Sequence, residues 1–255
     1  MTLTPSSIEV LDSRYVIGET IAVGGGATIV RAYDRRLGRA VAVKRASART
    51  AEAHARIREE AAILARCAHP NIVTCIDVTD DEAGAPYLVM QLVDGANLVQ
   101  HAHNGAIDED AARAWAIGLC RAVAYLHAHG IVHGDLKPQH LVISLADGRA
   151  ILVDFDRAHD ASMHGAPATG TEAYAAPEVR AGAPTSIASD RYALGTVLRW
   201  LFEHTASECG ASTAIRAVID RLTDDEPALR PSADATMRAL ASLTPSVDTA
   251  DRARN

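Results

Sequence analysis

The order of apolar and polar positions separates a strand-rich first third of the chain from a helical remainder. Five short runs are rich in β-branched residues and are bounded by glycine clusters or turn residues, as is typical of an antiparallel sheet. One helix is expected among them, from about Ala51 to Cys67, because the "HPN" that follows contains a proline, which disfavours helix in the residue before it. The five runs are residues 15–23, 28–34, 39–46, 71–80 and 85–93.

The pattern changes to helices after the "DG" at positions 94 and 95. Asp108 to His129 is the clearest helix, since acidic residues fill its first turn and Gly130 follows its end, which suits the helix dipole and a C-terminal cap. A second helix is expected from about Ser189 to Glu203. The apolar stripe that identifies the first helix consists of Trp115, Leu119, Val123 and Leu126.

These patterns predict an α+β chain with a small antiparallel β lobe containing one helix, a hinge near residues 91–95 and a larger, mainly helical lobe. At 255 residues with 48% hydrophobic residues, the chain can bury a substantial core. The formal net charge of −7 argues against nucleic acid as a partner, because phosphate backbones require a basic surface.

Targeting signals are not evident in the chain. The first residues lack the basic and apolar regions of a signal peptide, and the apolar runs are shorter than the roughly 18 residues of a membrane span. The cysteines show no C-x-x-C spacing and are interpreted as small core residues in a reducing compartment. We therefore expect a cytoplasmic protein without a membrane anchor.

The glycine cluster "AVGGGATI", residues 22–29, lies between two predicted strands. Glycines there would let backbone N–H groups approach a phosphate closely, although a flexible hairpin turn explains them equally well.

A lysine and a glutamate form the next candidate pair. Strand alternation in "AVAVK" places Ala42 and Lys44 on one face, where a flat base could lie beside its phosphates. Glu60 shares the apolar stripe of its helix with Ile57 and Leu64, and a carboxylate that faces inward is costly unless it is paired. Lys44 is the natural partner, whereas the neighbouring Glu59 should point elsewhere.

Two aspartates follow apolar segments in the second half of the chain. In "IVHGDLKPQHLV", Asp135 could accept a proton from an attacking hydroxyl and Lys137 could neutralise charge on a transferred phosphoryl group. Asp154 ends the apolar run "AILVDFD" and is a hard oxygen ligand suited to Mg²⁺, although an aspartate in this place is commonly a turn residue.

Taken in order, these motifs resemble the protein kinase family, specifically bacterial Ser/Thr kinases of the eukaryotic type. The resemblance implies a bilobal kinase-like fold with a kinase domain at 15–246, divided into an N-lobe (15–90), a hinge (91–95) and a C-lobe (96–246). Residues 1–14 form an N-terminal segment and 247–255 a disordered tail.

The resemblance assigns roles to individual residues. Lys44 and Glu60 match the lysine and its helix partner, Asp135 and Lys137 the catalytic residues, and Asp154 the metal-bridging aspartate. "GTEAYAAPE" at 170–178 resembles the end of an activation segment, "SDRYALG" at 189–195 resembles the buried helix beneath it, and Arg230 is expected to pair with Glu178. The expected ATP contacts are Ile21, Ala22, Val23, Gly24, Gly25, Gly26, Ala27, Ile29, Ala42, Lys44, Met90, Gln91, Val93 and Val142.

The chain departs from the family pattern at several positions. Ala22 and Ala27 replace glycines of the loop, and Asp156 replaces the glycine of the D-F-G turn. Gly134 replaces the arginine that normally reads an activation-segment phosphate, which predicts activity that is not switched in that way. His140 stands where a metal-binding asparagine is expected, and imidazole is a poor ligand for Mg²⁺. Either one metal site is lost, or Mn²⁺ is preferred, or His140 only hydrogen-bonds within the loop.

Three functions remain open from the sequence. The first is an ATP-dependent Ser/Thr protein kinase that uses Mg²⁺ or Mn²⁺, and the second is a pseudokinase that binds nucleotide as a scaffold or regulator. The third, a small-molecule phosphotransferase, is suggested by "HGDL" and by the short stretch of about forty residues between "SD" and "LRP", where a substrate-docking helix is expected to be missing. The protein substrate is not identified by the sequence, and a regulatory protein partner is expected.

Overall fold

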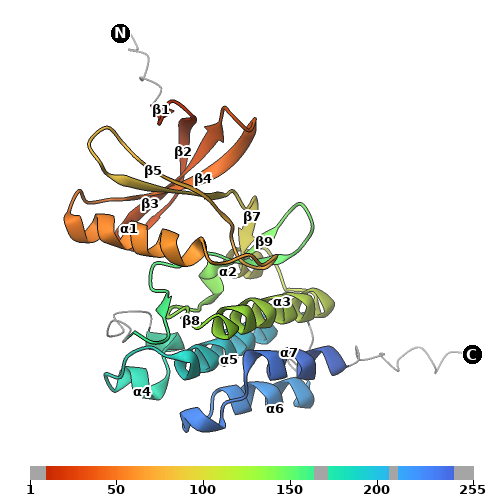
Figure 1. Ribbon diagram of the computed structural model, residues 1–255. Coiled ribbons are helices and arrows are strands. Elements are labelled where there is room, and N and C mark those ends of the chain that lie inside the picture. The colour runs from red at the N-terminus through yellow and green to blue at the C-terminus, as the bar shows by residue number, and fades with distance from the viewer. Residues whose placement is uncertain (1–9, 164–171, 207–211, 244–255) are drawn as a thin grey trace, which may run out of the picture.

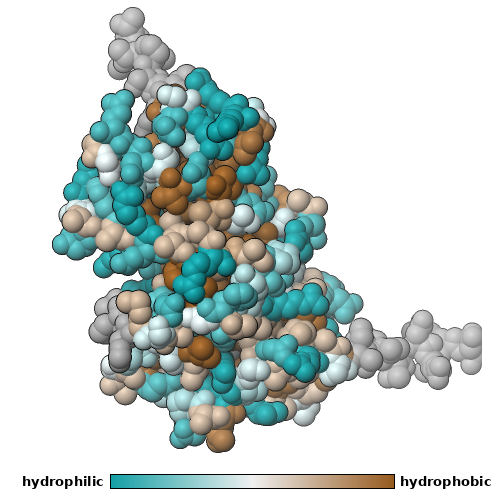
Figure 2. Space-filling model, in the orientation of Figure 1, coloured by the Kyte–Doolittle hydropathy of each residue, from teal (hydrophilic) through white to brown (hydrophobic). Residues whose placement is uncertain are grey.

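The computed structural model describes residues 10–163, 172–206 and 212–243. Strands dominate one lobe, which also holds helix α1, and helices dominate the other (Figure 1), as the hydrophobic pattern predicts. Hydrophilic residues cover much of the surface in the view of Figure 2, and apolar residues are visible where the lobes meet. No helix in the described ranges has both the length and the hydropathy to cross a membrane. The tail expected to be disordered, 247–255, lies outside the described residues.

The small lobe is built on a six-stranded antiparallel sheet with the order β1-β2-β3-β4-β6-β5. The sheet begins before Tyr15, because the two residues of β1 pair with the start of β2. One face holds an apolar cluster that includes Val41 and Val43, and the other face packs against the helix α1. The strands are β1 (Val10–Leu11), β2 (Tyr15–Gly24), β3 (Ala27–Asp34), β4 (Arg39–Ala46), β5 (Cys75–Asp80) and β6 (Pro86–Gln91).

Helix α1 (Ala51–Leu64) ends three residues before the predicted boundary. The side chain of Thr50 caps its first turn by accepting a hydrogen bond from the Ala53 amide at 3.2 Å. Helix α3 (Glu109–Ala128) matches its prediction, with Asp108 as the N-terminal cap. Both helices begin where a short polar side chain satisfies an otherwise unpaired amide.

The large lobe combines helices with short strands around the core. Helix α5 packs against α3 and lies below it in Figure 1, with one of its faces buried. The helices of the large lobe are α2 (Leu98–His103), α3, α4 (Pro177–Arg180), α5 (Ile187–Glu203), α6 (Thr213–Leu222) and α7 (Ala233–Ser242). Its strands are β7 (Gly95–Asn97), β8 (Ile131–Val132), β9 (Leu141–Ser144), β10 (Ala150–Leu152) and β11 (His159–Asp160).

The two lobes are joined by a continuous apolar core and by a buried asparagine. The side chain of Asn71 donates to the carbonyl of Ala150 at 2.8 Å, and its own carbonyl accepts from the Leu152 amide at 2.9 Å. Because Asn71 precedes β5 and Leu152 ends β10, these bonds fix the small lobe against the strand that leads to Asp154.

The stretch between "SD" and "LRP", where the sequence predicts that a substrate-docking helix is missing, runs through α5 and α6. Along the described chain, α5 is followed by α6 and α7, with residues 207–211 not described. The intervening segment bonds to the start of α3, since Ile107 and Thr205 form a parallel bridge.

Candidate active site

The glycine cluster forms a tight hairpin between β2 and β3. Gly24 pairs directly with Ala27, so only Gly25 and Gly26 make the turn, and their φ angles are +58° and +81°. Glycine adopts such angles without steric cost, which explains the sequence of this turn. The prediction that residues 22–29 lie between strands was therefore too broad, because residues 22–24 belong to β2 and residues 27–29 belong to β3.

The predicted pair of Lys44 and Glu60 is confirmed. The Lys44 ammonium lies 2.7 Å from Oε2 of Glu60, and both side chains are buried, while Glu59 is exposed. Lys44 also contacts Oδ1 of Asp154 at 2.8 Å. Burial would lower the pKa of Lys44, but the two carboxylates outweigh it and raise that pKa, so the ammonium stays charged.

Residues expected to hold the base of ATP come from both lobes. Ile29 lies opposite Lys44 in the sheet, and Met90 lies opposite Ala42. Gln91 ends β6, and Val142 lies on β9 of the large lobe, where it pairs with Asn97. The remaining expected contacts are Ile21, with half of its side chain exposed, and Val93, which is partly buried.

The catalytic-loop candidates lie next to each other. The Lys137 ammonium donates to Oδ2 of Asp135 at 2.7 Å. Behind them, His133 is fully buried and packs edge-on against Phe155, with ring centroids 4.9 Å apart. Burial lowers the pKa of His133 to about 4, so this imidazole is neutral near pH 7.

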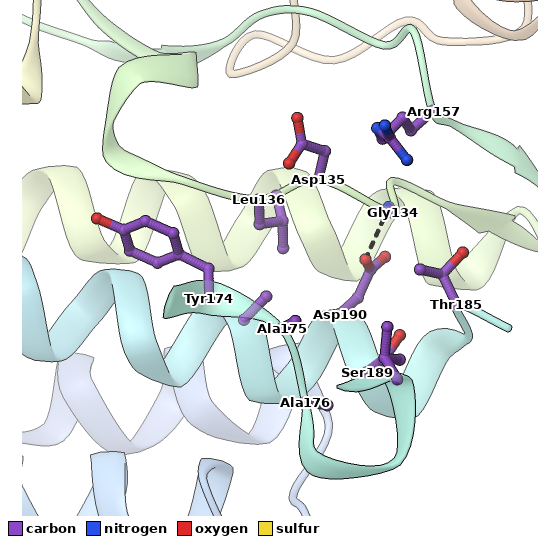
Figure 3. Close-up of a pocket in the computed structure, with 12 residues that line it drawn as sticks. Gly134, Asp135, Leu136, Arg157, Tyr174, Ala175, Ala176, Thr185, Ser189 and Asp190 are labelled. Atoms are coloured by element: carbon purple, nitrogen blue, oxygen red, sulfur yellow. Dashed lines mark hydrogen bonds between the residues drawn. The ribbon is translucent and has the colours of Figure 1, made fainter. Parts of the chain in front are cut away.

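Asp190 of α5 supports the loop from below, a role that the sequence analysis did not assign. Its carboxylate accepts hydrogen bonds from the amides of His133 at 2.8 Å and Gly134 at 2.9 Å (Figure 3). Nε2 of His127 lies 3.1 Å from the same carboxylate. A signal existed, because Asp190 lies on the face of α5 that buries Leu194 and Val197, and a buried carboxylate requires partners.

Gly134 has a conformation that disfavours other residues. Its φ is +76°, and a Cβ atom at this position would lie 2.9 Å from the carbonyl oxygen of Arg157. The backbone at Arg157 therefore packs directly against Gly134, the position at which the resembled protein kinases have an arginine. Both segments line a pocket with Leu136, Tyr174 and Asp190 (Figure 3).

Asp154 and His140 meet at the end of β10. Nε2 of His140 lies 2.9 Å from Oδ2 of Asp154, and its Nδ1 lies 3.0 Å from the carbonyl oxygen of Asp135. Burial would raise the pKa of Asp154, but the hydrogen bond with His140 and the Lys44 ammonium hold it well below its usual value. Asp154 has a φ of +63°, a strained angle for a residue with a side chain.

Few of the described metal-ligating side chains lie near Asp154 and His140. The described residues contain no group of three or more His, Cys, Asp and Glu side chains arranged to hold a metal ion. Asp154 and His140 could supply two ligands, which fits Mg²⁺ or Mn²⁺ bound together with phosphate oxygens. The carboxylate of Asp156 does not complete such a group.

The expected ion pair between Arg230 and Glu178 is confirmed. The Arg230 guanidinium is fully buried and contacts the two carboxylate oxygens at 2.6 and 2.9 Å. It ties the segment before α7 to α4, which begins with the last two residues of the motif "GTEAYAAPE". Gly170 and Thr171 of this motif lie outside the described residues.

Comparison with protein families decides what this arrangement is. The model of the protein kinase domain matches residues 15–223. The chain belongs to the protein kinase family. This kinase domain therefore has the bilobal α+β fold that the resemblance implied.

Relatives of this kinase domain include bacterial serine/threonine-protein kinases. It is 36% identical over 201 residues to a probable serine/threonine-protein kinase of Streptomyces coelicolor, covering 74% of the chain and 30% of the relative. It is 36% identical over 208 residues to serine/threonine-protein kinase PknB of Mycobacterium tuberculosis, covering 76% and 33%. For PknB of Mycolicibacterium smegmatis the values are 34% over 239 residues, covering 89% and 38%. The chain thus spans about a third of the length of these relatives.

Proposed function

We propose that the protein is an ATP-dependent Ser/Thr protein kinase that phosphorylates a protein hydroxyl. The observation that carries this proposal is the buried Lys44–Glu60 pair held against Asp154, with Asp135 and Lys137 on the neighbouring loop. Lys44 and Glu60 are buried and the other three charges are partly buried, and charged groups gathered in this way are typical of sites that act on a charged ligand. The printed names of the relatives, which are serine/threonine-protein kinases, support the same activity.

ATP is proposed to bind between the lobes. The adenine would contact Ala42, Met90, Gln91 and Val93 from one side and Val142 from the other. The β2–β3 hairpin would cover the phosphates with the backbone N–H groups of its glycines, and Lys44 would neutralise phosphate oxygens.

Asp154 and His140 are proposed to hold the divalent metal. When bound there, Mg²⁺ or Mn²⁺ would neutralise negative charge on the phosphates of ATP. Nε2 of His140 needs a free lone pair to coordinate a metal, so its contact with Asp154 must give way when the metal binds. We propose that the softer imidazole donor makes Mn²⁺ the preferred ion.

The transfer step uses the loop residues. Asp135 accepts the proton of the Ser or Thr hydroxyl as the hydroxyl oxygen bonds to the γ-phosphorus of ATP. The bond between that phosphorus and the bridging oxygen breaks, and ADP leaves with the electron pair. Lys137 offsets the charge on the transferred group, and its contact with Asp135 at 2.7 Å supports this role.

Activity independent of an arginine-read phosphate is also proposed. The positive φ of Gly134 and the nearby Arg157 carbonyl leave no room there for an arginine side chain without backbone movement. The packing of the loop on Asp190 supports an arrangement of Asp135 that exists before any modification. A cytoplasmic location and a regulatory protein partner remain part of the proposal.

One observation favours a second candidate, a pseudokinase that binds nucleotide as a scaffold. The His140 imidazole occupies the side of Asp154 that faces the catalytic loop, where it competes with a metal ion. Nucleotide binding without transfer would follow if this contact persists.

The test is transfer of labelled γ-phosphate from ATP to the protein itself and to casein, in Mg²⁺ and in Mn²⁺. Asp135→Ala should bind ATP like the wild type but lose transfer by roughly 10²-fold or more. Glu60→Gln should weaken transfer strongly, whereas the matched Glu59→Gln should not. A wild type that binds ATP but transfers nothing with either metal would refute the kinase and support the pseudokinase.

A further inference from the structure

The end of the β3–β4 hairpin concentrates positive charge on an otherwise acidic chain. Residues 31–39, "RAYDRRLGR", contain four arginines and one aspartate, a formal net charge of +3. Since the whole chain is −7, the remainder is −10. We call residues 31–39 the arginine hairpin.

The four arginines are exposed and have no carboxylate partner within the described part of the chain. Several other exposed arginines of this protein pair with acids, whereas the hairpin brings together, within nine residues, four arginines that are unpaired in the described structure. The exposed arginines that form such pairs are Arg49, Arg58, Arg66, Arg149, Arg199 and Arg238.

The aspartate of the hairpin, Asp34, is buried and uses its carboxylate in internal hydrogen bonds. Asp34 is buried and binds the guanidinium of Arg14 at 2.7 and 3.0 Å, which helps to lower its pKa to about 2. Its Oδ1 also accepts hydrogen bonds from the amides of Arg36 and Leu37 at 2.9 and 3.1 Å. The turn is therefore held rigidly, so little backbone conformational entropy is lost when a ligand binds its arginines.

Two apolar side chains accompany the charges. Tyr33 is 50% exposed and Leu37 is 54% exposed. Aromatic and arginine side chains are enriched at protein interfaces, where they combine apolar contact with charge-assisted hydrogen bonds.

The arginine hairpin is remote from the chemistry. Arg39 and Lys44 lie on the same strand, and five residues of strand span about 16 Å. A ligand on the hairpin end would therefore not occupy the nucleotide or acceptor position.

We propose that the arginine hairpin is a docking site for a short acidic segment of a partner protein that also carries an apolar side chain. A short segment is favoured over a membrane or a nucleic acid because a large anionic surface would also face the acidic remainder of the molecule. Charges beyond about 10 Å are screened at 0.1 M salt, so a ligand confined to the hairpin meets mainly its positive charge.

The proposal is tested by fluorescence anisotropy with a labelled peptide, Glu-Asp-Glu-Leu-Asp-Glu-Asp, and its uncharged match, Gln-Asn-Gln-Leu-Asn-Gln-Asn. The wild-type chain should bind only the acidic peptide, more weakly at higher salt. Arg35→Glu/Arg36→Glu should raise its Kd roughly ten-fold or more. Arg121→Glu/Arg221→Glu, an equal charge change at exposed sites on α3 and α6, should leave it within about two-fold.

Thermal unfolding of both double variants verifies that they fold, and their autophosphorylation should match that of the wild type. Leu37→Ser should weaken binding of the acidic peptide but leave the salt dependence of that binding unchanged. The proposal fails if the wild type does not bind the acidic peptide, or if both double variants lose binding equally. It also fails if phosphatidylserine vesicles or duplex DNA bind the hairpin more tightly than the peptide, or if the hairpin variant instead abolishes self-association of the chain.

Discussion

Nε2 of His140 lies 2.9 Å from Oδ2 of Asp154, so the imidazole contacts the carboxylate that is proposed to hold the metal ion. The same ring reaches the carbonyl of Asp135 through Nδ1 at 3.0 Å. His140 therefore connects the catalytic loop to the strand end, and its replacement should change metal use before it changes the fold.

Metal preference is the first prediction. We expect wild-type transfer to be faster in Mn²⁺ than in Mg²⁺, and His140→Asn to shift the ratio of the two rates toward Mg²⁺ by roughly ten-fold, because an amide oxygen is a harder donor than imidazole. Initial rates across a titration of each metal measure this shift. His103→Asn, at an exposed position on α2, is the control. An unchanged ratio in His140→Asn would limit His140 to its hydrogen bonds.

The second prediction concerns the loop glycine. Gly134 and Gly130 both have positive φ, +76° and +68°, but only at Gly134 would a Cβ meet other atoms within 4 Å. Gly130→Ala should lower the free energy of unfolding by about 1–2 kcal/mol through backbone strain alone. Gly134→Ala should lower it by about 1–3 kcal/mol more, because the Arg157 backbone must move. Urea unfolding of both variants separates the two effects, and equal losses would contradict the close packing.

The third prediction concerns the buried guanidinium of Arg230. Arg230→Met leaves the Glu178 carboxylate and the backbone carbonyls of Ala188 and Asp224 without their donor. The free energy of unfolding should fall by about 3–5 kcal/mol. Urea denaturation measures the loss, and Arg199→Met, which removes an exposed pair with Asp220, should be indistinguishable from the wild type. Comparable losses in both variants would refute a special role for the buried pair.

The fourth prediction concerns pH. His133 has a pKa of about 4 in the fold against an ordinary value of 6.5, because burial disfavours its charged form. The unfolded chain therefore binds this proton first, so the contribution of His133 to stability is present above pH 6.5 and is lost as the pH falls toward 4. Between pH 7.5 and pH 5.0 this loss amounts to about 2 kcal/mol.

The pH prediction is measured by urea unfolding of the wild type and His133→Asn at both pH values. The asparagine can still accept a hydrogen bond from the Asp135 amide but does not titrate. The stability difference between the two proteins should shift by about 2 kcal/mol in favour of the variant at pH 5.0. A constant difference would mean that His133 is not buried in its neutral form.

Local patterns were sufficient for the five longer strands of the small lobe, for α1, α3 and α5, and for one half of the site. The inward position of Glu60 follows from periodicity, because side chains three and four residues apart share one face of a helix. The pairing with Lys44 followed from the cost of burying a carboxylate alone. The same argument applied to α5 would have identified Asp190 as a residue in need of partners.

The sequence by itself determined which residues carry charge into the core and in what order they occur. Only the tertiary structure decided that Asp190 holds the amides of His133 and Gly134, and that His140 reaches Asp154. These contacts join residues from 14 to 57 positions apart, and no local periodicity specifies such distances or angles. They depend on how α5, the catalytic loop and β10 pack together, since hydrogen bonds form only where packing brings donor and acceptor within about 3 Å.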